Sequence, residues 1–352
     1  EALGVKQNIM LEEETLDEEN DFDETPMVKL VNQILTSAVF QRASDIHIDP
    51  LDEKTLDLRI STLPTVRGEK VVMRILDLSG SMNKIHSIGL SQKEERQLRQ
   101  MIAQPNGIVL VSGPTGSGKT TTLYACLNEL NNPNVNIVTV EDPVEIKMAG
   151  VNQVQVHPDV DLTFANALRS ILRQDPNIIM IGEIRDVETA EISIRASLTG
   201  HLVLSTIHTN NAIKTITRLL DMDIEPFLIA SSLTGIVSQR LVRRLCPECS
   251  THDAPTEAEK SMFDKYHIDV KSVKRAKGCP SCNYKGYAGR VGIFEVLPIT
   301  KGMQKLIAEN APMSELEKQA QSEGLVTIMQ SGLDKVKAGV TTLEEVMKVA
   351  SE

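Results

Sequence analysis

Residues 113–120 read Gly-Pro-Thr-Gly-Ser-Gly-Lys-Thr, a complete G-x-x-x-x-G-K-[ST] phosphate loop. The apolar run Ile108–Val111 precedes it and predicts a buried strand, and the residues that follow predict the start of a helix. In this context the glycines let backbone N–H groups surround phosphates, Lys119 would reach the β- and γ-phosphates, and the Thr120 hydroxyl would bind Mg²⁺. A nucleotide site is therefore predicted over Gly113, Pro114, Thr115, Gly116, Ser117, Gly118, Lys119, Thr120 and Thr121.

Strand and helix patterns alternate on both sides of this loop. The strand candidates are Ile108–Val111, Asn136–Val140, Ile178–Ile181 and Leu202–Thr206. Such alternation predicts an α/β fold with a mainly parallel sheet and helices on both faces, a RecA-like P-loop core. We place this core at residues 91–245, where Ser91 and Glu94 form a capping box that opens its first helix.

Other segments flank the predicted core. Residues 1–24 are densely acidic and predict a solvated linker that would lead from a further N-terminal region. Residues 25–80 predict a small α+β domain, and residues 81–90 a hinge. After the core, residues 246–290 hold four cysteines, and residues 291–352 have helical periodicity.

Composition narrows the classes of function. The chain has 352 residues, 41% of them hydrophobic, and a net charge of −11, so no global positive charge favours nucleic acid. Trp is absent and aromatic residues make up only 3%, which argues against stacking platforms for single strands. We find neither an apolar run of membrane-spanning length nor a signal peptide, and expect a cytoplasmic protein.

Hydrolysis needs groups that fix Mg²⁺ and orient water. Glu183 follows an apolar strand and is our first choice for the carboxylate that acts on Mg²⁺ or on the attacking water. Glu141 and Asp142 end another predicted strand and could polarise water, with Glu145 a weaker candidate. The alternative for each is an ordinary charge at a strand end.

Two histidines bracket the predicted strand at Leu202–Thr206. His208 would lie at the end nearer the γ-phosphate, where it could donate a hydrogen bond and report whether that phosphate is present. His201 lies at the other end of the strand. A lone histidine is more often structural, so this prediction depends on the combination of motifs.

The cysteines are unevenly placed. Cys126 stands alone in the predicted helix after the phosphate loop and is expected to be a buried small hydrophobe. The others form two C-x-x-C pairs that suit one structural Zn²⁺, with a small helical insert at about 256–266 between them. Disulfides are the alternative, which a cytoplasmic chain disfavours. The predicted zinc ligands are Cys246, Cys249, Cys279 and Cys282.

In this order, the motifs resemble the Walker A, Asp, Walker B and His boxes of the secretion ATPases. They occupy residues 113–120, 139–145, 178–186 and 200–210. The cysteine segment is similar to the branch that serves type II secretion and type IV pilus assembly, rather than pilus retraction. The runs Arg42–Ile48 and Gly286–Glu295 belong to the same resemblance. The resemblance extends from about Glu24 to the C-terminus.

The resemblance implies a homo-hexamer of two-domain subunits that binds ATP, Mg²⁺ and Zn²⁺. Arginines of the small domain, here Arg67 and Arg74, would reach the phosphates. Rotation of the domains would act on an inner-membrane platform protein that moves pilin or pseudopilin. The chain would lie in the cytoplasm and be held at the inner membrane by partner proteins. One of these partners would bind the further N-terminal region. The chain would not bind nucleic acid.

One departure concerns the small domain. In the family, several dozen residues with further arginines separate the strand ending at Ile60 from Ser61, whereas here the two abut. A RecA-like nucleic-acid translocase is one alternative function, against which the acidic charge and the low aromatic content count. The abutting segments add a second alternative, a nucleotide-dependent scaffold that does not hydrolyse ATP. Stimulation of turnover by DNA would favour the first, and turnover no faster than that of Lys119→Ala would favour the second.

Overall fold

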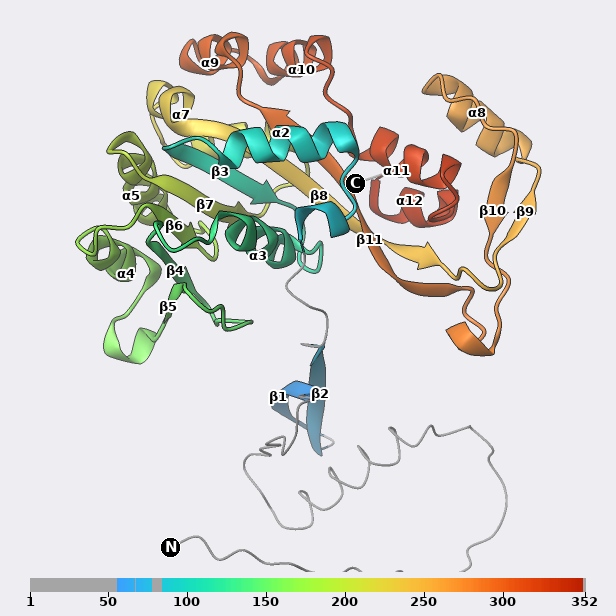
Figure 1. Ribbon diagram of the computed structural model, residues 1–352, viewed down its shortest axis with the longest axis horizontal. Coiled ribbons are helices and arrows are strands. Elements are labelled where there is room, and N and C mark those ends of the chain that lie inside the picture. Colours follow the sequence, from blue (N-terminus) through green and yellow to red (C-terminus); the bar gives the residue numbers. More distant parts are fainter. Residues whose placement is uncertain (1–55, 67, 78–83, 351–352) are drawn as a thin grey trace, which may run out of the picture. The chain divides into compact units, whose positions relative to one another are not determined.

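The protein is seen here in a computed structural model that describes residues 56–66, 68–77 and 84–350 (Figure 1). The chain divides into two compact units, Glu1–Ser79 and Gly80–Glu352. The acidic linker at 1–24 and the part of the predicted small domain before Leu56, including a helix expected at about 27–40, lie outside the described residues. The hinge predicted at 81–90 is described from Lys84 on, and there Ile85 is fully buried in the second unit.

The described part of the first unit is one hairpin. Strands β1 (Leu56–Thr65) and β2 (Gly68–Asp77) pair antiparallel along their whole length. The junction between Ile60 and Ser61 lies inside β1, so the abutting segments form one continuous strand.

The second unit is built on a seven-stranded sheet of order β11-β8-β3-β7-β6-β4-β5. Every neighbouring pair is parallel except β11 with β8. This confirms the predicted α/β fold with a mainly parallel sheet. The strands are β3 (Gly107–Ser112), β4 (Ile137–Glu141), β5 (Asn152–Gln155), β6 (Ile178–Ile181), β7 (Leu202–Ile207), β8 (Leu233–Leu245) and β11 (Tyr287–Pro298).

The four predicted strands correspond to β3, β4, β6 and β7, whereas β5, β8 and β11 were not predicted. Strand β5 is a polar edge strand without an apolar run. Strand β11 lies where we expected helices from 291 on, and its buried part pairs with β8 to extend the core sheet. That pairing joins segments about fifty residues apart, so no local pattern signals it.

Helices cover both faces of the sheet (Figure 1). One face packs on α4 (Phe164–Ile171), α5 (Val187–Leu198), α6 (Ala212–Asp221), α7 (Pro226–Ser232), α9 (Lys301–Ala308) and α10 (Met313–Ser322). The other packs on η1 (Ile85–Ser87), α2 (Gln92–Ile102) and α3 (Lys119–Leu130), which includes the buried Cys126. The capping box of Ser91 and Glu94 opens α2 as predicted.

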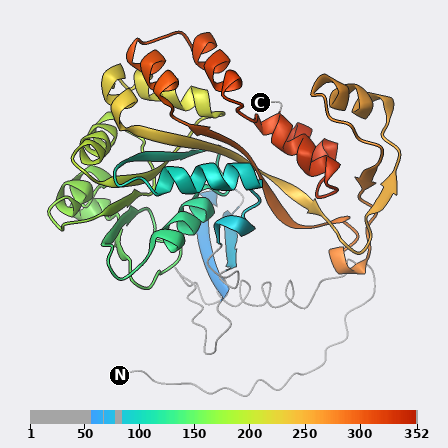
Figure 2. The ribbon, with the colours of Figure 1, turned by 45° about the horizontal axis from the view of Figure 1, so that its top comes forward.

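A smaller module follows β8. It contains β9 (Thr251–Asp253), α8 (Glu257–Lys265), β10 (Val273–Arg275) and η3 (Pro280–Cys282). Helix α8 confirms the insert predicted at 256–266. The red helices α11 (Ile328–Lys337) and α12 (Leu343–Ala350) lie between the sheet and this module in Figure 2.

The C-terminal helices contact both neighbours. Phe263 of α8 is buried against Leu333 and Val346, which come from α11 and α12. On the sheet side, Arg243 of β8 donates to both carboxylate oxygens of Glu345 and lowers the pKa of that carboxyl to about 2. The module is thus attached to the core through α11 and α12.

Candidate active site

The phosphate loop joins β3 to α3. Helix α3 begins at Lys119, and Gly118 before it is left-handed, with φ of 89°. At Gly113, φ is 147°, and a Cβ would lie 2.5 Å from the backbone oxygen of Gln239 and 2.6 Å from Ser117 Oγ. A side chain at residue 113 would therefore collide with backbone, so the loop keeps its narrow path only with glycine there.

Lys119 is turned back onto its own loop. Its Nζ donates to the backbone oxygens of Gly113 at 2.9 Å and Pro114 at 3.0 Å, and the residue is only 9% exposed. Burial lowers the pKa of the ammonium, the Glu183 charge raises it, and the Arg240 charge lowers it further. An anionic phosphate in the loop would relieve the cost of burying this cation, so the site fits the ligand that the motif predicts.

Glu183 and His208 lie next to each other. Strand β6 ends two residues before Glu183, and β7 ends directly before His208. Nε2 of His208 is 3.5 Å from a carboxylate oxygen of Glu183, whose other oxygen pairs with Arg185. Burial and the nearby Lys119 charge lower the pKa of His208, against the opposing effect of Glu183.

Sheet topology explains why these residues meet. Strands β3, β7 and β6 are consecutive neighbours and run parallel, so their carboxyl ends share one edge. Lys119, His208 and Glu183 each follow one of these strands. Ligands of open α/β sheets bind at this edge.

Glu141 occupies a different environment at the end of β4. It is 3% exposed, and its oxygens accept hydrogen bonds from Thr139 Oγ1, Gln153 Nε2 and the Tyr124 hydroxyl. Tyr124 belongs to α3. Glu141 therefore links β4 to the helix that follows the phosphate loop, with both oxygens already bonded.

The remaining predicted residues are spread over the two units. Thr120 is partly exposed and Thr121 exposed at the start of α3. His201 lies at the opposite end of β7 from His208, where its Nδ1 is 2.8 Å from the backbone oxygen of Ala196. Arg67 lies outside the described residues, and Arg74 lies in β2, opposite Arg59. The part assigned to these arginines stays a prediction.

Sequence reasoning missed Gln239, which is 1% exposed in β8. Its Nε2 donates to the backbone oxygen of Ser117 at 2.8 Å, and its Oε1 accepts from Thr122 Oγ1 at 2.7 Å. One side chain thus holds both the phosphate loop and the first turn of α3. The available signal was the polar triplet Ser238-Gln239-Arg240 between two apolar pairs, Ile236-Val237 and Leu241-Val242.

The four cysteines of the small module form one cluster. Their sulfur atoms lie within 4.8 Å of one another, with separations of 3.8 Å between Cys249 and Cys282 and 3.9 Å between Cys246 and Cys279. Four thiolates at about 2.3 Å from a tetrahedral Zn²⁺ would be about 3.8 Å apart. All four are free thiols, so the disulfide alternative does not hold in this structure.

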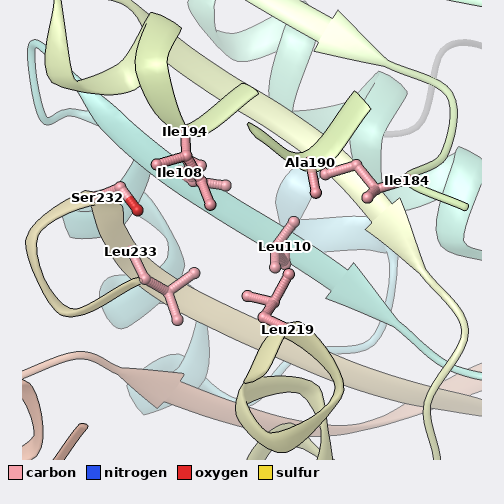
Figure 3. Close-up of a pocket in the computed structure, with 8 residues that line it drawn as sticks. All are labelled: Ile108, Leu110, Ile184, Ala190, Ile194, Leu219, Ser232 and Leu233. Atoms are coloured by element: carbon pink, nitrogen blue, oxygen red, sulfur yellow. The ribbon is translucent and has the colours of Figure 1, made fainter. Parts of the chain in front are cut away.

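A small cavity lies in the core beside β3 (Figure 3). Its volume is about 10 Å³, room for about one water molecule. Seven of the eight residues that line it are apolar, so it is a packing gap of the core and not a nucleotide pocket. They are Ile108, Leu110, Ile184, Ala190, Ile194, Leu219, Ser232 and Leu233.

Among the described residues, no helix is both long enough and apolar enough to cross a lipid bilayer.

Comparison with known proteins places the chain among secretion proteins. A family model described as type II/IV secretion system protein matches residues 50–348. Type II secretion system ATPase E of Vibrio cholerae is 44% identical over 386 residues, which cover 94% of this chain and 76% of that protein. Type IV pilus assembly ATPase PilB of Myxococcus xanthus is 44% identical over 385 residues, 92% of this chain and 68% of that protein.

Both alignments are longer than the 352 residues of the chain. Each relative therefore carries residues inside the aligned region that have no counterpart here. This agrees with a segment that is shorter than in the family, as noted at Ile60 and Ser61.

Solved structures agree on the fold. The pilus retraction motor PilT with bound ADP has a TM-score of 0.61 at 28% identity, covering 84% of this chain and 78% of that one. The ATPase DotB of Legionella pneumophila has a TM-score of 0.65 at 20% identity, covering 92% of this chain and 82% of that one. This second likeness concerns the fold alone.

Proposed function

Since the chain belongs to the family of type II/IV secretion system proteins, we propose that it converts ATP hydrolysis into movement of pilin or pseudopilin subunits. It is an ATP-hydrolysing enzyme of the secretion and pilus-assembly type, like the relatives that are 44% identical to it over 386 and 385 aligned residues. The observation that carries the proposal is the meeting of Lys119, Glu183 and His208 at one edge of the sheet.

Each of these residues has a part to play. Lys119 would exchange its two backbone carbonyl partners for the β- and γ-phosphates, with the loop N–H groups around them. The Thr120 hydroxyl would hold Mg²⁺, which neutralises charge on the phosphates. His208 would donate to the γ-phosphate from a ring N–H.

Glu183 is the better candidate to act on Mg²⁺ or on the attacking water. One oxygen of Glu183 lies near His208, and the negative charge of Glu183 raises the pKa of Lys119. Glu141 is buried and bonded at both oxygens, whereas the side chain of Glu183 is 15% exposed and its partners, His208 and Arg185, are much more exposed. We therefore propose Glu183 as the catalytic carboxylate and Glu141 as support for it.

The cysteine cluster would hold Zn²⁺ in a structural role. Four thiolates fill a tetrahedral shell and leave no position for substrate. Backbone N–H groups of Gly278, Cys279 and Gly286 point at the sulfur atoms of Cys249 and Cys282, which favours thiolates there. The metal would fix the module beside α11 and α12.

We further propose that the motor is a homo-hexamer in the cytoplasm. Arg67 and Arg74 of the small unit would complete the charge around the phosphates. The ring would act on an inner-membrane platform protein, with a further partner for the N-terminal region, and would not bind nucleic acid. These points rest on membership of the family, and the net charge of −11 agrees with the last.

Substitution of the catalytic carboxylate tests the mechanism. Glu183→Gln should bind ATP as the wild type does but hydrolyse it about 10²- to 10⁴-fold more slowly. Lys119→Ala gives the background rate, and Glu188→Gln, an exposed carboxylate on α5, is the matched control with unchanged turnover. An active Glu183→Gln beside an inactive Glu141→Gln would move the role to Glu141.

A further inference from the structure

Two oppositely charged side chains that have no part in the proposed mechanism are buried on strands β8 and β11. Arg240 of β8 is 3% exposed and Glu295 of β11 is 5% exposed. The strands are paired, with Glu295 opposite Ser238, two residues from Arg240. Buried charges are costly unless they are bonded, so their partners indicate what they are for.

Both side chains hold the backbone just after His208. Nη2 of Arg240 donates to the backbone oxygen of Asn210 at 2.8 Å. The carboxylate of Glu295 accepts from the backbone N–H of Ala212 at 2.7 Å. The two bonded atoms are two residues apart along the chain and lie at the entrance of α6.

The rest of this segment is bonded mainly to itself and to α6. Thr209 Oγ1 lies 2.7 Å from Thr215 Oγ1 in α6, and Asn211 caps the helix by accepting from the Lys214 N–H. Those contacts would move together with the helix. Arg240 and Glu295, by contrast, come from the sheet and fix the segment relative to it.

The pKa of Glu295 lies above its ordinary value because the carboxyl is buried, and three neighbouring groups oppose that rise. Burial raises the pKa of the carboxyl, while the backbone N–H groups of Ala212 and Ile328 and the Arg240 charge lower it. Ala212 and Ile328 are the first residues of α6 and α11. The carboxylate is therefore placed at two helix N-termini, where negative charge is stabilised.

We propose that Arg240 and Glu295 are positioning residues that hold segment 208–212 so that His208 faces Glu183 beside the phosphate loop. They act through His208. The inference rests on the role proposed above for His208, because a displaced imidazole slows the reaction only if it takes part. A shift of about 1 Å in a catalytic group can cost about a hundredfold in rate.

The test is a double-mutant cycle on the purified chain. Glu295→Gln keeps the size of the side chain and removes its charge, and should lower kcat for ATP about ten- to hundredfold with KM within about twofold. His208→Gln should lower kcat as well. If Glu295 acts through His208, the double variant should be no slower than His208→Gln alone.

Glu345→Gln is the matched control. Glu345 is also a buried carboxylate, and it pairs with Arg243 of β8, away from segment 208–212. Its loss should lower the melting temperature while kcat stays within about twofold. Should Glu295→Gln fail to fold, Arg240→Lys, which keeps the charge but loses the bond to Asn210, enters the same cycle.

The outcomes separate the two proposals. Multiplicative losses in the double variant, or an equal loss of kcat in Glu345→Gln, would overturn the positioning role and leave the function of the site intact. Wild-type turnover in His208→Gln would overturn the role of His208 and, with it, this inference. A change in KM alone would show that Glu295 serves nucleotide binding instead.

Discussion

Gln239 offers a test of how the phosphate loop is held. The substitution Gln239→Met keeps the length of the side chain and removes both polar groups. The backbone oxygen of Ser117 and the hydroxyl of Thr122 then lose partners at 2.8 and 2.7 Å. Both contacts are buried, so water does not replace them.

The size of the effect follows from these two contacts. An unsatisfied buried group costs about 1–3 kcal/mol. The Thr122 hydroxyl can turn to a backbone oxygen of its own helix, whereas Ser117 has no such choice. We expect the free energy of unfolding to fall by about 2–4 kcal/mol, and the melting temperature by about 5–10 °C.

Nucleotide binding should weaken too. Without the bonds of Gln239, the phosphate loop must become ordered when ADP binds. If this ordering costs about 1.4 kcal/mol of binding free energy, the Kd for ADP rises about tenfold. Thermal unfolding and titration with ADP measure the two effects. Gln104→Met is the control, since that exposed side chain donates to the backbone oxygen of Gln100, away from the phosphate loop, and should shift neither value. Wild-type melting and affinity in Gln239→Met would refute the reasoning.

Further predictions concern the module and the histidine. Cys246→Ser should lower the zinc content and the stability, because the site loses one of its four thiolates; unchanged metal content would exclude the four-cysteine site. Phe263→Ala should cost about 3–5 kcal/mol and raise hydrogen exchange across α8, whereas slow exchange there would show that α8 is held otherwise. Because the pKa of His208 is lower in the folded protein than its ordinary value of 6.5, its neutral ring contributes to folding stability above pH 6.5. This contribution is lost as the pH falls through the pKa of the folded state, and a pKa at or above 6.5 in an NMR titration of the ring would contradict the lowered pKa.

Local chemistry explains what could be predicted. The phosphate loop can be recognised from eight consecutive residues, because the backbone around the phosphates needs glycines with positive φ at fixed positions. Strands β3, β6 and β7 are short apolar runs whose ends carry the polar residues of the site, and the cysteine spacing alone suggested a metal. Each signal is contained within a few residues.

What only the tertiary structure decided is how distant segments meet. Strand β8 brings Gln239 to the phosphate loop and Arg240 to the segment after His208, while β11 brings Glu295 from the far side of the cysteine module. Neither strand shows a clear alternation of apolar and polar residues in the sequence. Strands β8 and β11 form because they pair with each other, although about fifty residues separate them along the chain. Buried polar side chains such as these are meaningful only beside their partners, and those partners are set by the path of the backbone and not by the neighbouring sequence.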